Sequence, residues 1–295
     1  MDIKMLSICI PTYNRCHILD ETLEKLFNNP DFDNNIIEVI VSDNCSNDST
    51  KAVVSKYPLV SYFCNDTNIG FSNLTTVLSY ARGKYVKLFN DTFSFKPNML
   101  KQLLNRIILH ENDNINLFFY PNFLHNQNVS RKVKSVSSFL YECSFNTTWT
   151  ASIGFWKRDF DKITNPNRYA PLHFPHLEWM YSMVRDGKVT MIYFEDFYNV
   201  AIPNKKGGYN VFKTFADDYL EIIKKQRINI FIYELEKYRL CRYFLYPWLQ
   251  TLLLRERTNY SYDTNKSFSL IFKKYWYEPY LYPMLLMFLF KKWVK

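Results

Sequence analysis

The sequence predicts an α/β protein with a mostly parallel sheet flanked by helices and a helical, basic, aromatic-rich C-terminal region. Short apolar runs alternate with amphipathic stretches through the first hundred residues, which is typical of repeated strand–helix units. Polar clusters directly follow these apolar runs. Hydrophobic residues make up 47% and charged residues 22% of the 295 residues, so the chain can bury a substantial core.

The elements of the first hundred residues follow from hydrophobic periodicity. We expect a short helix after residue 48, capped by Asp48 or Ser49, and we expect Gly83 to end a helix. The predicted strands are 6–10, 36–41, 60–63 and 85–89, and the predicted longer helices are 18–28 and 71–82.

The middle of the chain is less regular. We expect strands at 116–120, 151–155 and 189–194 and a helix at 178–185. The polar stretch 126–138 and residues 203–209 are expected to be irregular, and helices are expected to dominate from Asp217 onward.

Each of the first four predicted strands is followed by a polar loop. Because the carboxyl ends of parallel strands meet at one edge of a sheet, we expect these loops to form a ligand site there. The loops are Pro11-Thr-Tyr-Asn-Arg15, Ser42-Asp-Asn-Cys-Ser-Asn-Asp48, Asn65-Asp-Thr-Asn-Ile-Gly70 and Asn90-Asp-Thr92.

In order and spacing these loops resemble family 2 glycosyltransferases of the GT-A fold, of the type that builds bacterial surface polysaccharides. Four family motifs carry the resemblance over residues 6–92: P-x-Y-N, D-[DN]-x-S-x-D, N-x-G and A-x-G. They stand here as Pro11 to Asn14, Asp43 to Asp48, Asn68 to Gly70 and Ala81 to Gly83. The resemblance implies sugar transfer from a nucleotide-sugar donor.

The resemblance also implies a set of nucleotide-binding residues. Asp43 would accept a hydrogen bond from the imide N–H of uracil or thymine, which favours a UDP or dTDP donor. The alternative is a turn residue that satisfies its own backbone. The other implied nucleotide-binding residues are Pro11, Thr12, Tyr13, Asn14, Asn68, Asn73 and Asn90.

The metal-binding motif of the family is reduced in this sequence. Family members place two carboxylates here to hold Mg²⁺ or Mn²⁺, but Asp91 is flanked by Asn90 and Thr92. We therefore expect a weakened divalent-cation site at Asp91. Lys205 and Lys206 could compensate by folding over the donor diphosphate, or they could belong to a solvated turn.

The resemblance places the catalytic base at Glu178, at the start of a predicted helix. An inverting transfer requires a base beside the acceptor hydroxyl, and a carboxylate can serve. A glutamate favoured by the helix dipole is the structural alternative. Glu195-Asp196 is the rival acidic pair, with His173 and His176 as secondary candidates.

The C-terminal region is basic. Residues 219–295 hold 14 Lys and Arg against 6 Asp and Glu, which accounts for +8 of the net charge of +9. The uncharged run 281–290 is too short to span a bilayer, and Pro283 is expected to disturb a helix there. Lysines and aromatic residues at both ends of this run favour an anionic membrane surface as partner, and a helix docked on the catalytic domain is the alternative.

These observations predict a catalytic domain over 1–215 and a helical region over 216–295. The catalytic domain divides into a nucleotide-sugar half, 1–100, and an acceptor half, 101–215. With no signal-peptide pattern and no spanning run, we expect a cytoplasmic protein, peripheral on the inner face of the cell membrane. The expected acceptor is a glycan or a lipid-linked saccharide, and nucleic acid is not expected as a partner. The remaining hypotheses are a nucleotidyltransferase on a related sheet and a non-catalytic nucleic-acid-binding protein.

Overall fold

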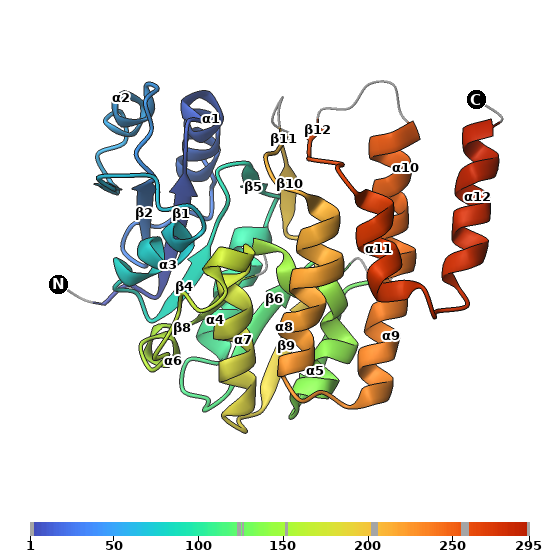
Figure 1. Ribbon diagram of the computed structural model, residues 1–295. Helices are drawn as coiled ribbons and strands as arrows, with labels where there is room; N and C mark the ends of the chain where they lie inside the picture. Colours follow the sequence, from blue (N-terminus) through green and yellow to red (C-terminus); the bar gives the residue numbers. More distant parts are fainter. Residues whose placement is uncertain are drawn as a thin grey trace. The chain divides into compact units, whose positions relative to one another are not determined.

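The computed structural model describes residues 3–122, 125, 127–150, 153–201, 206–254 and 260–293, with only the backbone of Lys206. It divides into two compact units, Met1–Ala201 and Ile202–Lys295 (Figure 1). The functional division at residues 215 and 216 stays a prediction.

A five-stranded sheet forms the centre of the first unit, in the order β3-β2-β1-β4-β8. Neighbouring strands are parallel except for β8, which runs antiparallel to β4. The predicted, mostly parallel sheet is therefore confirmed. The strands are β1 (Leu6–Thr12), β2 (Ile37–Asp43), β3 (Val60–Cys64), β4 (Tyr85–Leu88) and β8 (Gly154–Trp156).

Helices cover both faces of this sheet. Leucines of α1 (Cys16–Phe27) and α4 (Met99–Leu109) pack in one core cluster with Leu6, Ile8 and Ile10, the alternate residues of β1. Helix α3 (Ser72–Ser79) contacts β1, β2 and β4, and its buried residues lie outside that cluster, so it covers the opposite face.

Gly83 is needed for close packing rather than for ending a helix. Helix α3 already ends at Ser79, so the predicted extension to residue 82 is wrong. A Cβ built on Gly83 would lie 2.5 Å from Ser7 Oγ and 2.9 Å from Ser7 N. The Gly83 N–H donates to Ser7 Oγ at 2.9 Å, which ties the start of β4 to β1.

The short helix α2 (Thr50–Val54) begins as predicted after the polar loop of β2. Ser49 is the N-cap residue, and its side chain makes no capping hydrogen bond; the Thr50 N–H instead donates to Asp48 Oδ1 at 3.0 Å. Asp48 Oδ2 also accepts the Cys16 N–H at the start of α1, so one carboxylate holds two helix starts together.

A second sheet has the order β6-β9-β7. Strands β6 (Asn116–Tyr120) and β9 (Thr190–Phe194) are parallel and lie where the sequence predicts them. Strand β7 (Val129–Val133) pairs antiparallel with β9, although the stretch 126–138 was expected to be irregular. Helix α7 (Pro175–Arg185) contains the predicted 178–185 helix. This unit also contains β5 (Phe93–Phe95), β10 (Tyr198–Val200), α5 (Val136–Cys143), α6 (Lys157–Phe160) and the short 3-10 helices Ser144–Thr148 and Ala170–Leu172.

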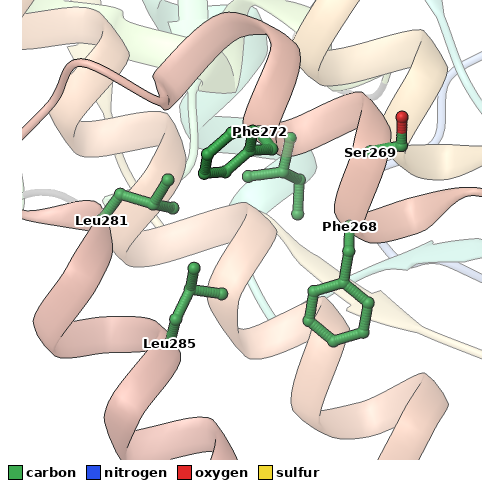
Figure 2. Close-up of a pocket in the computed structure, with 6 residues that line it drawn as sticks. Phe268, Ser269, Phe272, Leu281 and Leu285 are labelled. Atoms are coloured by element: carbon green, nitrogen blue, oxygen red, sulfur yellow. The ribbon is translucent and has the colours of Figure 1, made fainter.

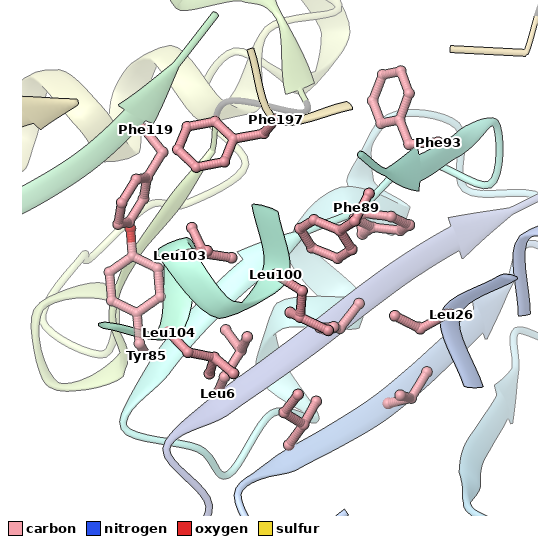
Figure 3. Close-up of a cluster of buried hydrophobic side chains, with 14 of the residues drawn as sticks. Leu6, Leu26, Tyr85, Phe89, Phe93, Leu100, Leu103, Leu104, Phe119 and Phe197 are labelled. Carbon is pink, nitrogen blue, oxygen red and sulfur yellow. The ribbon is translucent and has the colours of Figure 1, made fainter. Parts of the chain in front are cut away.

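Aromatic side chains join the two sheets of the first unit (Figure 3). Tyr85 of β4 meets Phe119 of β6 edge to face, with ring centroids 5.9 Å apart. Tyr85 also donates its hydroxyl to the Leu117 carbonyl oxygen at 2.8 Å. Phe119 in turn packs edge to face against Phe197, at 5.7 Å. The core is therefore continuous from the first sheet to the second.

The second unit is mainly helical, as predicted. Pro283 lies in the first turn of α12, where its missing N–H has no intrahelical partner to lose, so the expected disturbance does not occur. No helix of the described residues has the length and apolarity needed to cross a membrane. Its described α-helices are α8 (Leu220–Lys225), α9 (Ile230–Leu240), α10 (Tyr246–Leu254), α11 (Ser267–Tyr275) and α12 (Leu281–Trp293). The unit also has two π-helical segments, Lys213–Tyr219 and Cys241–Leu245, and the short strands β11 (Lys206–Gly207) and β12 (Tyr260–Ser261).

Candidate active site

Backbone hydrogen bonds bring the polar loops together at the carboxyl edge of the first sheet. The Asn44 N–H donates to the Thr12 carbonyl oxygen and the Asn65 N–H to the Asp43 carbonyl oxygen, both at 2.9 Å. The loop after β4 joins them through the side chain of Thr12, described below. The predicted convergence of the loops is therefore present in the fold.

Asp43 lies at the end of β2 and is 2% exposed. Its Oδ1 accepts the Ser46 N–H at 2.9 Å, and its Oδ2 accepts the Tyr62 hydroxyl at 2.7 Å. Each carboxylate oxygen has a second lone pair, so Asp43 keeps the capacity to accept a ligand N–H.

A network of asparagine side chains fixes the next loop. Asn44 donates to Asn68 Oδ1 at 2.8 Å and accepts from Asn65 at 3.1 Å. Asn73 is 4% exposed; its amide donates to the Ser42 carbonyl oxygen at 3.0 Å, and its oxygen accepts from Ser42 Oγ and Asn65. Asn73 thus holds the ends of β2 and β3 in place.

The loop after β1 is locked onto the loop after β2. Asn14 has a positive φ of 50°, and its N–H donates to Ser46 Oγ at 2.8 Å. The Asn47 N–H donates back to Asn14 Oδ1 at 2.9 Å. Tyr13, next to Asn14 in the chain, is 43% exposed, and Pro11 is partly exposed at the end of β1.

Asp91 is buried and bound by two groups of the β1 loop. It is 2% exposed; Thr12 Oγ1 donates to its Oδ2 and the Arg15 guanidinium to its Oδ1, both at 2.9 Å. Burial raises the pKa of Asp91, and Arg15 and Thr12 oppose that rise. Thr22 Oγ1 also donates to the Asp91 carbonyl oxygen at 2.8 Å.

The neighbours of Asp91 offer little to a cation. Asn90 Oδ1 accepts the Thr150 hydroxyl at 2.9 Å. Within the described residues, no group of three or more His, Cys, Asp and Glu side chains could hold a metal ion together. Of positions 90 to 92 only Asp91 carries a carboxylate, and it already pairs with a guanidinium.

Glu178 lies in the first turn of α7 and is 5% exposed. Its Oε1 lies 3.1 Å from Arg168 Nη1 and 3.7 Å from Arg185 Nη2, and it accepts the Ser182 hydroxyl at 3.1 Å. Its Oε2 is buried without a hydrogen-bond partner among the described residues. Helix α7 contacts α3, which follows the asparagine network.

Glu195 and Asp196, the alternative candidates for the catalytic base, both form ion pairs with basic side chains of the first unit. Glu195 is 4% exposed and pairs with Arg106 at 3.3 Å, and Asp196 pairs with Lys96. His176 is fully enclosed, and burial lowers its pKa to about 3, so it is neutral at physiological pH. Lys205 and the side chain of Lys206 lie outside the described residues.

The model of the family Glycosyl transferase family 2 matches residues 7–178, more than half of the chain and all of the loops described above. The chain belongs to glycosyl transferase family 2. The expected family is thereby confirmed.

One curated relative of this family 2 chain is the abequosyltransferase RfbV of Salmonella typhimurium, 36% identical over 92 residues. The match covers 29% of this chain and 27% of the relative, so the chain spans about a quarter of that protein.

Solved structures share the fold of this family 2 chain. S. aureus TarS 1–349 in complex with UDP-GlcNAc has a TM-score of 0.57 at 16% identity, covering 92% of this chain and 79% of that one. The mannosyltransferase PcManGT of Pyrobaculum calidifontis, in complex with GDP-Man and Mn²⁺, has a TM-score of 0.56 at 14% identity, covering 100% and 87%. The match to another TarS structure covers 85% of this chain but only 46% of TarS. At these identities the likeness concerns the fold, and the expected GT-A fold is confirmed.

Two basic residues of the family 2 site were not singled out from the sequence. Arg15 pairs with Asp91, and Arg168 pairs with Glu178. The sequence does hold a signal for Arg15, because a cation directly follows P-x-Y-N in a chain that lacks the second metal carboxylate. Arg168 carries no such signal, because its pairing depends on the packing of residues 165–178.

Proposed function

We propose that this chain transfers a sugar from a UDP- or dTDP-type donor to a glycan or lipid-linked acceptor, with inversion, in bacterial surface-polysaccharide synthesis. The observation that carries this proposal is the convergence of Thr12, Asp43 and Asp91 at the carboxyl edge of the parallel sheet. Open α/β sheets bind ligands at that edge. The family match favours sugar transfer over nucleotidyl transfer.

The base of the donor would lie against the loops after β1, β2 and β3. Asp43, held by Tyr62 and the Ser46 N–H, would accept the imide N–H of a pyrimidine. Pro11 and Tyr13 would border the base and ribose. Asn68 and Asn73 would act mainly through the shape of the loop, because their amides hold neighbouring groups.

Glu178 would accept the proton of the acceptor hydroxyl. Its buried Oε2 accepts no hydrogen bond from the described residues, while Arg168 and Ser182 hold Oε1. An acceptor O–H that reached Oε2 would meet an unfilled hydrogen-bonding position, and the contacts to Oε1 would orient the carboxylate. The anomeric carbon would form a bond to the acceptor oxygen as the bond to the donor phosphate breaks.

A divalent cation at Asp91 is the family's expected cofactor, and one solved structure of this fold holds Mn²⁺. The donor set here does not fit such an ion, because the one carboxylate available is bound by a guanidinium. Asn90, Lys205 and Lys206 would then contact the donor without a metal between them.

An anionic membrane surface would be the second partner, placing the protein on the inner face of the cell membrane. Helix α12 buries Leu281, Met284 and Phe288. Five large apolar side chains on it are exposed besides Tyr282, and Lys291 and Lys292 lie in its last turn. Between α11 and α12 lies an apolar pocket of about 280 Å³ (Figure 2). Apolar area flanked by lysines is the composition that binds anionic lipid. The exposed residues are Leu286, Met287, Leu289, Phe290 and Trp293.

A nucleotide screen tests the proposal. Thermal melting would be measured with UDP, TDP, CDP, GDP and ADP, because a ligand that binds only the folded chain raises the melting temperature. A pyrimidine diphosphate should give the largest rise. A chain stabilised by none of these nucleotides, or only by ADP, would contradict the assignment of the Asp43 loop.

A further inference from the structure

The contact between Arg15 and Asp91 occupies the position at which the family's metal carboxylates are expected. Arg15 is the residue immediately before α1, and its Nη1 lies 2.9 Å from Asp91 Oδ1. Asp91 is only 2% exposed at its side chain, whereas Arg15 is 41% exposed. The acid is therefore internal, and the cation that it holds faces solvent at the edge of the sheet.

This geometry leaves the guanidinium able to bind a second anion. A guanidinium has five N–H donors in a rigid plane, and one of them serves the Asp91 oxygen. The remaining donors suit two phosphate oxygens, which Arg binds in a bidentate manner. Thr12, on the other Asp91 oxygen, keeps the carboxylate from turning away.

A divalent cation is poorly served at the same place. It would share Asp91 with a positive charge that already contacts Oδ1. A second carboxylate, which would offset that repulsion, is missing from positions 90 and 92, which hold Asn and Thr.

We infer that Arg15, oriented by Asp91, supplies the positive charge that binds the donor diphosphate in place of a divalent metal ion. The inference rests on the proposed function and goes further, because it assigns the charge to a side chain of this protein. As the sugar leaves, the bond between the anomeric carbon and the phosphate oxygen breaks and its electron pair stays on the diphosphate. The guanidinium stabilises that charge, while the acceptor proton passes to the base. Arg15 touches the donor, and Asp91 is a positioning residue.

Calorimetry with UDP and with uridine tests the inference, each in excess EDTA and in excess Mg²⁺. The wild-type chain should bind UDP equally in both buffers. Arg15→Gln should weaken UDP binding about ten- to a hundredfold, the usual effect of losing hydrogen bonds to a charged group. Uridine affinity should not change, because uridine carries no phosphate. Arg15→Lys should retain part of the UDP affinity.

Two further variants separate charge from position. Arg82→Gln removes an exposed arginine side chain from the same unit and should leave UDP affinity unchanged. Asp91→Asn keeps the size of the side chain but loses the ion pair, so it should weaken UDP binding less than Arg15→Gln does and make that binding more sensitive to salt.

The possible failures can be told apart. UDP binding that requires Mg²⁺ and survives Arg15→Gln would overturn the inference and leave the proposed function standing. If no nucleoside diphosphate binds the folded wild-type chain in either buffer, both are wrong. The melting temperatures of Arg15→Gln and Arg15→Lys would also be measured, so that a loss of folding is not mistaken for a loss of binding.

Discussion

Tyr62 donates its hydroxyl to Asp43 Oδ2 at 2.7 Å, across the neighbouring strands β3 and β2. Burial and the bond to Asp43 raise the pKa of Tyr62, so the hydroxyl stays protonated and keeps donating at physiological pH. The Ser46 N–H holds the other carboxylate oxygen. The orientation of the Asp43 carboxylate, which is proposed to bind the nucleotide base, is therefore set before any ligand binds.

Asp43→Ala should weaken UDP binding by about 1–3 kcal/mol, because the pyrimidine imide loses its acceptor. Isothermal titration calorimetry would measure this change. Asp186→Ala, which removes an exposed carboxylate outside the nucleotide-site loops, is the control and should leave the affinity unchanged.

Tyr62→Phe should have a different effect from Asp43→Ala. It removes one hydrogen bond to Asp43 and should lower the free energy of unfolding by about 1 kcal/mol, while most of the UDP affinity remains. Equal UDP affinity in Asp43→Ala and the wild type would show that Asp43 does not bind the pyrimidine of the donor.

Glu178→Gln should lower turnover about 10²–10⁴-fold, because the side chain keeps its size but loses its basicity. Donor affinity should stay close to the wild-type value, because the base acts on the acceptor. Single-turnover kinetics, together with calorimetry of the donor, would separate the two effects. Normal turnover in Glu178→Gln would move the role to Glu195 or Asp196.

Arg168→Gln tests how Glu178 is held. Arg168 contacts Oε1 at 3.1 Å, so its loss should lower turnover without abolishing activity and leave donor affinity unchanged. A structural role alone would instead lower the melting temperature and leave the turnover of the folded fraction unchanged.

Lys87 should make the chain less stable at neutral pH than at alkaline pH. It is completely buried in β4, and burial lowers its pKa from 10.5 to about 7. Between these values the unfolded chain binds a proton that the folded chain does not, so stability rises as the pH increases from about 7 toward 10.5. Below about pH 7 the folded chain carries the buried charged ammonium of Lys87, and its full cost in folding free energy, on the order of a few kcal/mol, is present.

Lys87→Met should remove this dependence. The melting temperature of the variant should exceed that of the wild type most at pH 7, and the difference should shrink toward pH 9.5. Lys101→Met, an exposed change on α4, should give no such trend. A difference that does not vary with pH would mean that the ammonium of Lys87 is stabilised in the fold.

Replacing the exposed face of α12 should release the protein from anionic lipid. The triple change Leu286→Ser, Leu289→Ser and Phe290→Ser leaves the buried Leu281, Met284 and Phe288 intact. Cosedimentation with vesicles of phosphatidylglycerol and phosphatidylcholine should fall at least tenfold, because the inserted apolar area is lost. Transfer to a soluble acceptor should not change.

Two controls accompany the vesicle experiment. Leu109→Ser removes a residue that is 64% exposed in the first unit and should not affect sedimentation. Lys291→Glu with Lys292→Glu should weaken binding to anionic vesicles, since each basic residue near the surface contributes about 1 kcal/mol. A triple variant that binds lipid normally, or that unfolds, would favour the docked-helix alternative.

The amino-acid sequence by itself determined the family, the positions of the first four strands and the edge at which the polar loops converge. These features depend on local signals: apolar runs of strand length, turn residues at their ends and the period of the helices between them. Strand β6 agrees with its prediction residue for residue, and β1 to β4 agree within one or two residues at their ends.

Only the tertiary structure decided which side chains hold one another. Asp91 and Arg15 are 76 residues apart in sequence, and the side-chain oxygen of Asn73 accepts hydrogen bonds from Ser42 and Asn65. Gly83 was read as a helix stop, but its role comes from the approach of β1. Strand β7 was missed because its exposed polar residues give no apolar alternation, and it exists through pairing with β9. Hydrophobic periodicity indicates which residues of one segment are buried and which face water. Ion pairs and close backbone contacts depend instead on the distance between segments that only folding brings together.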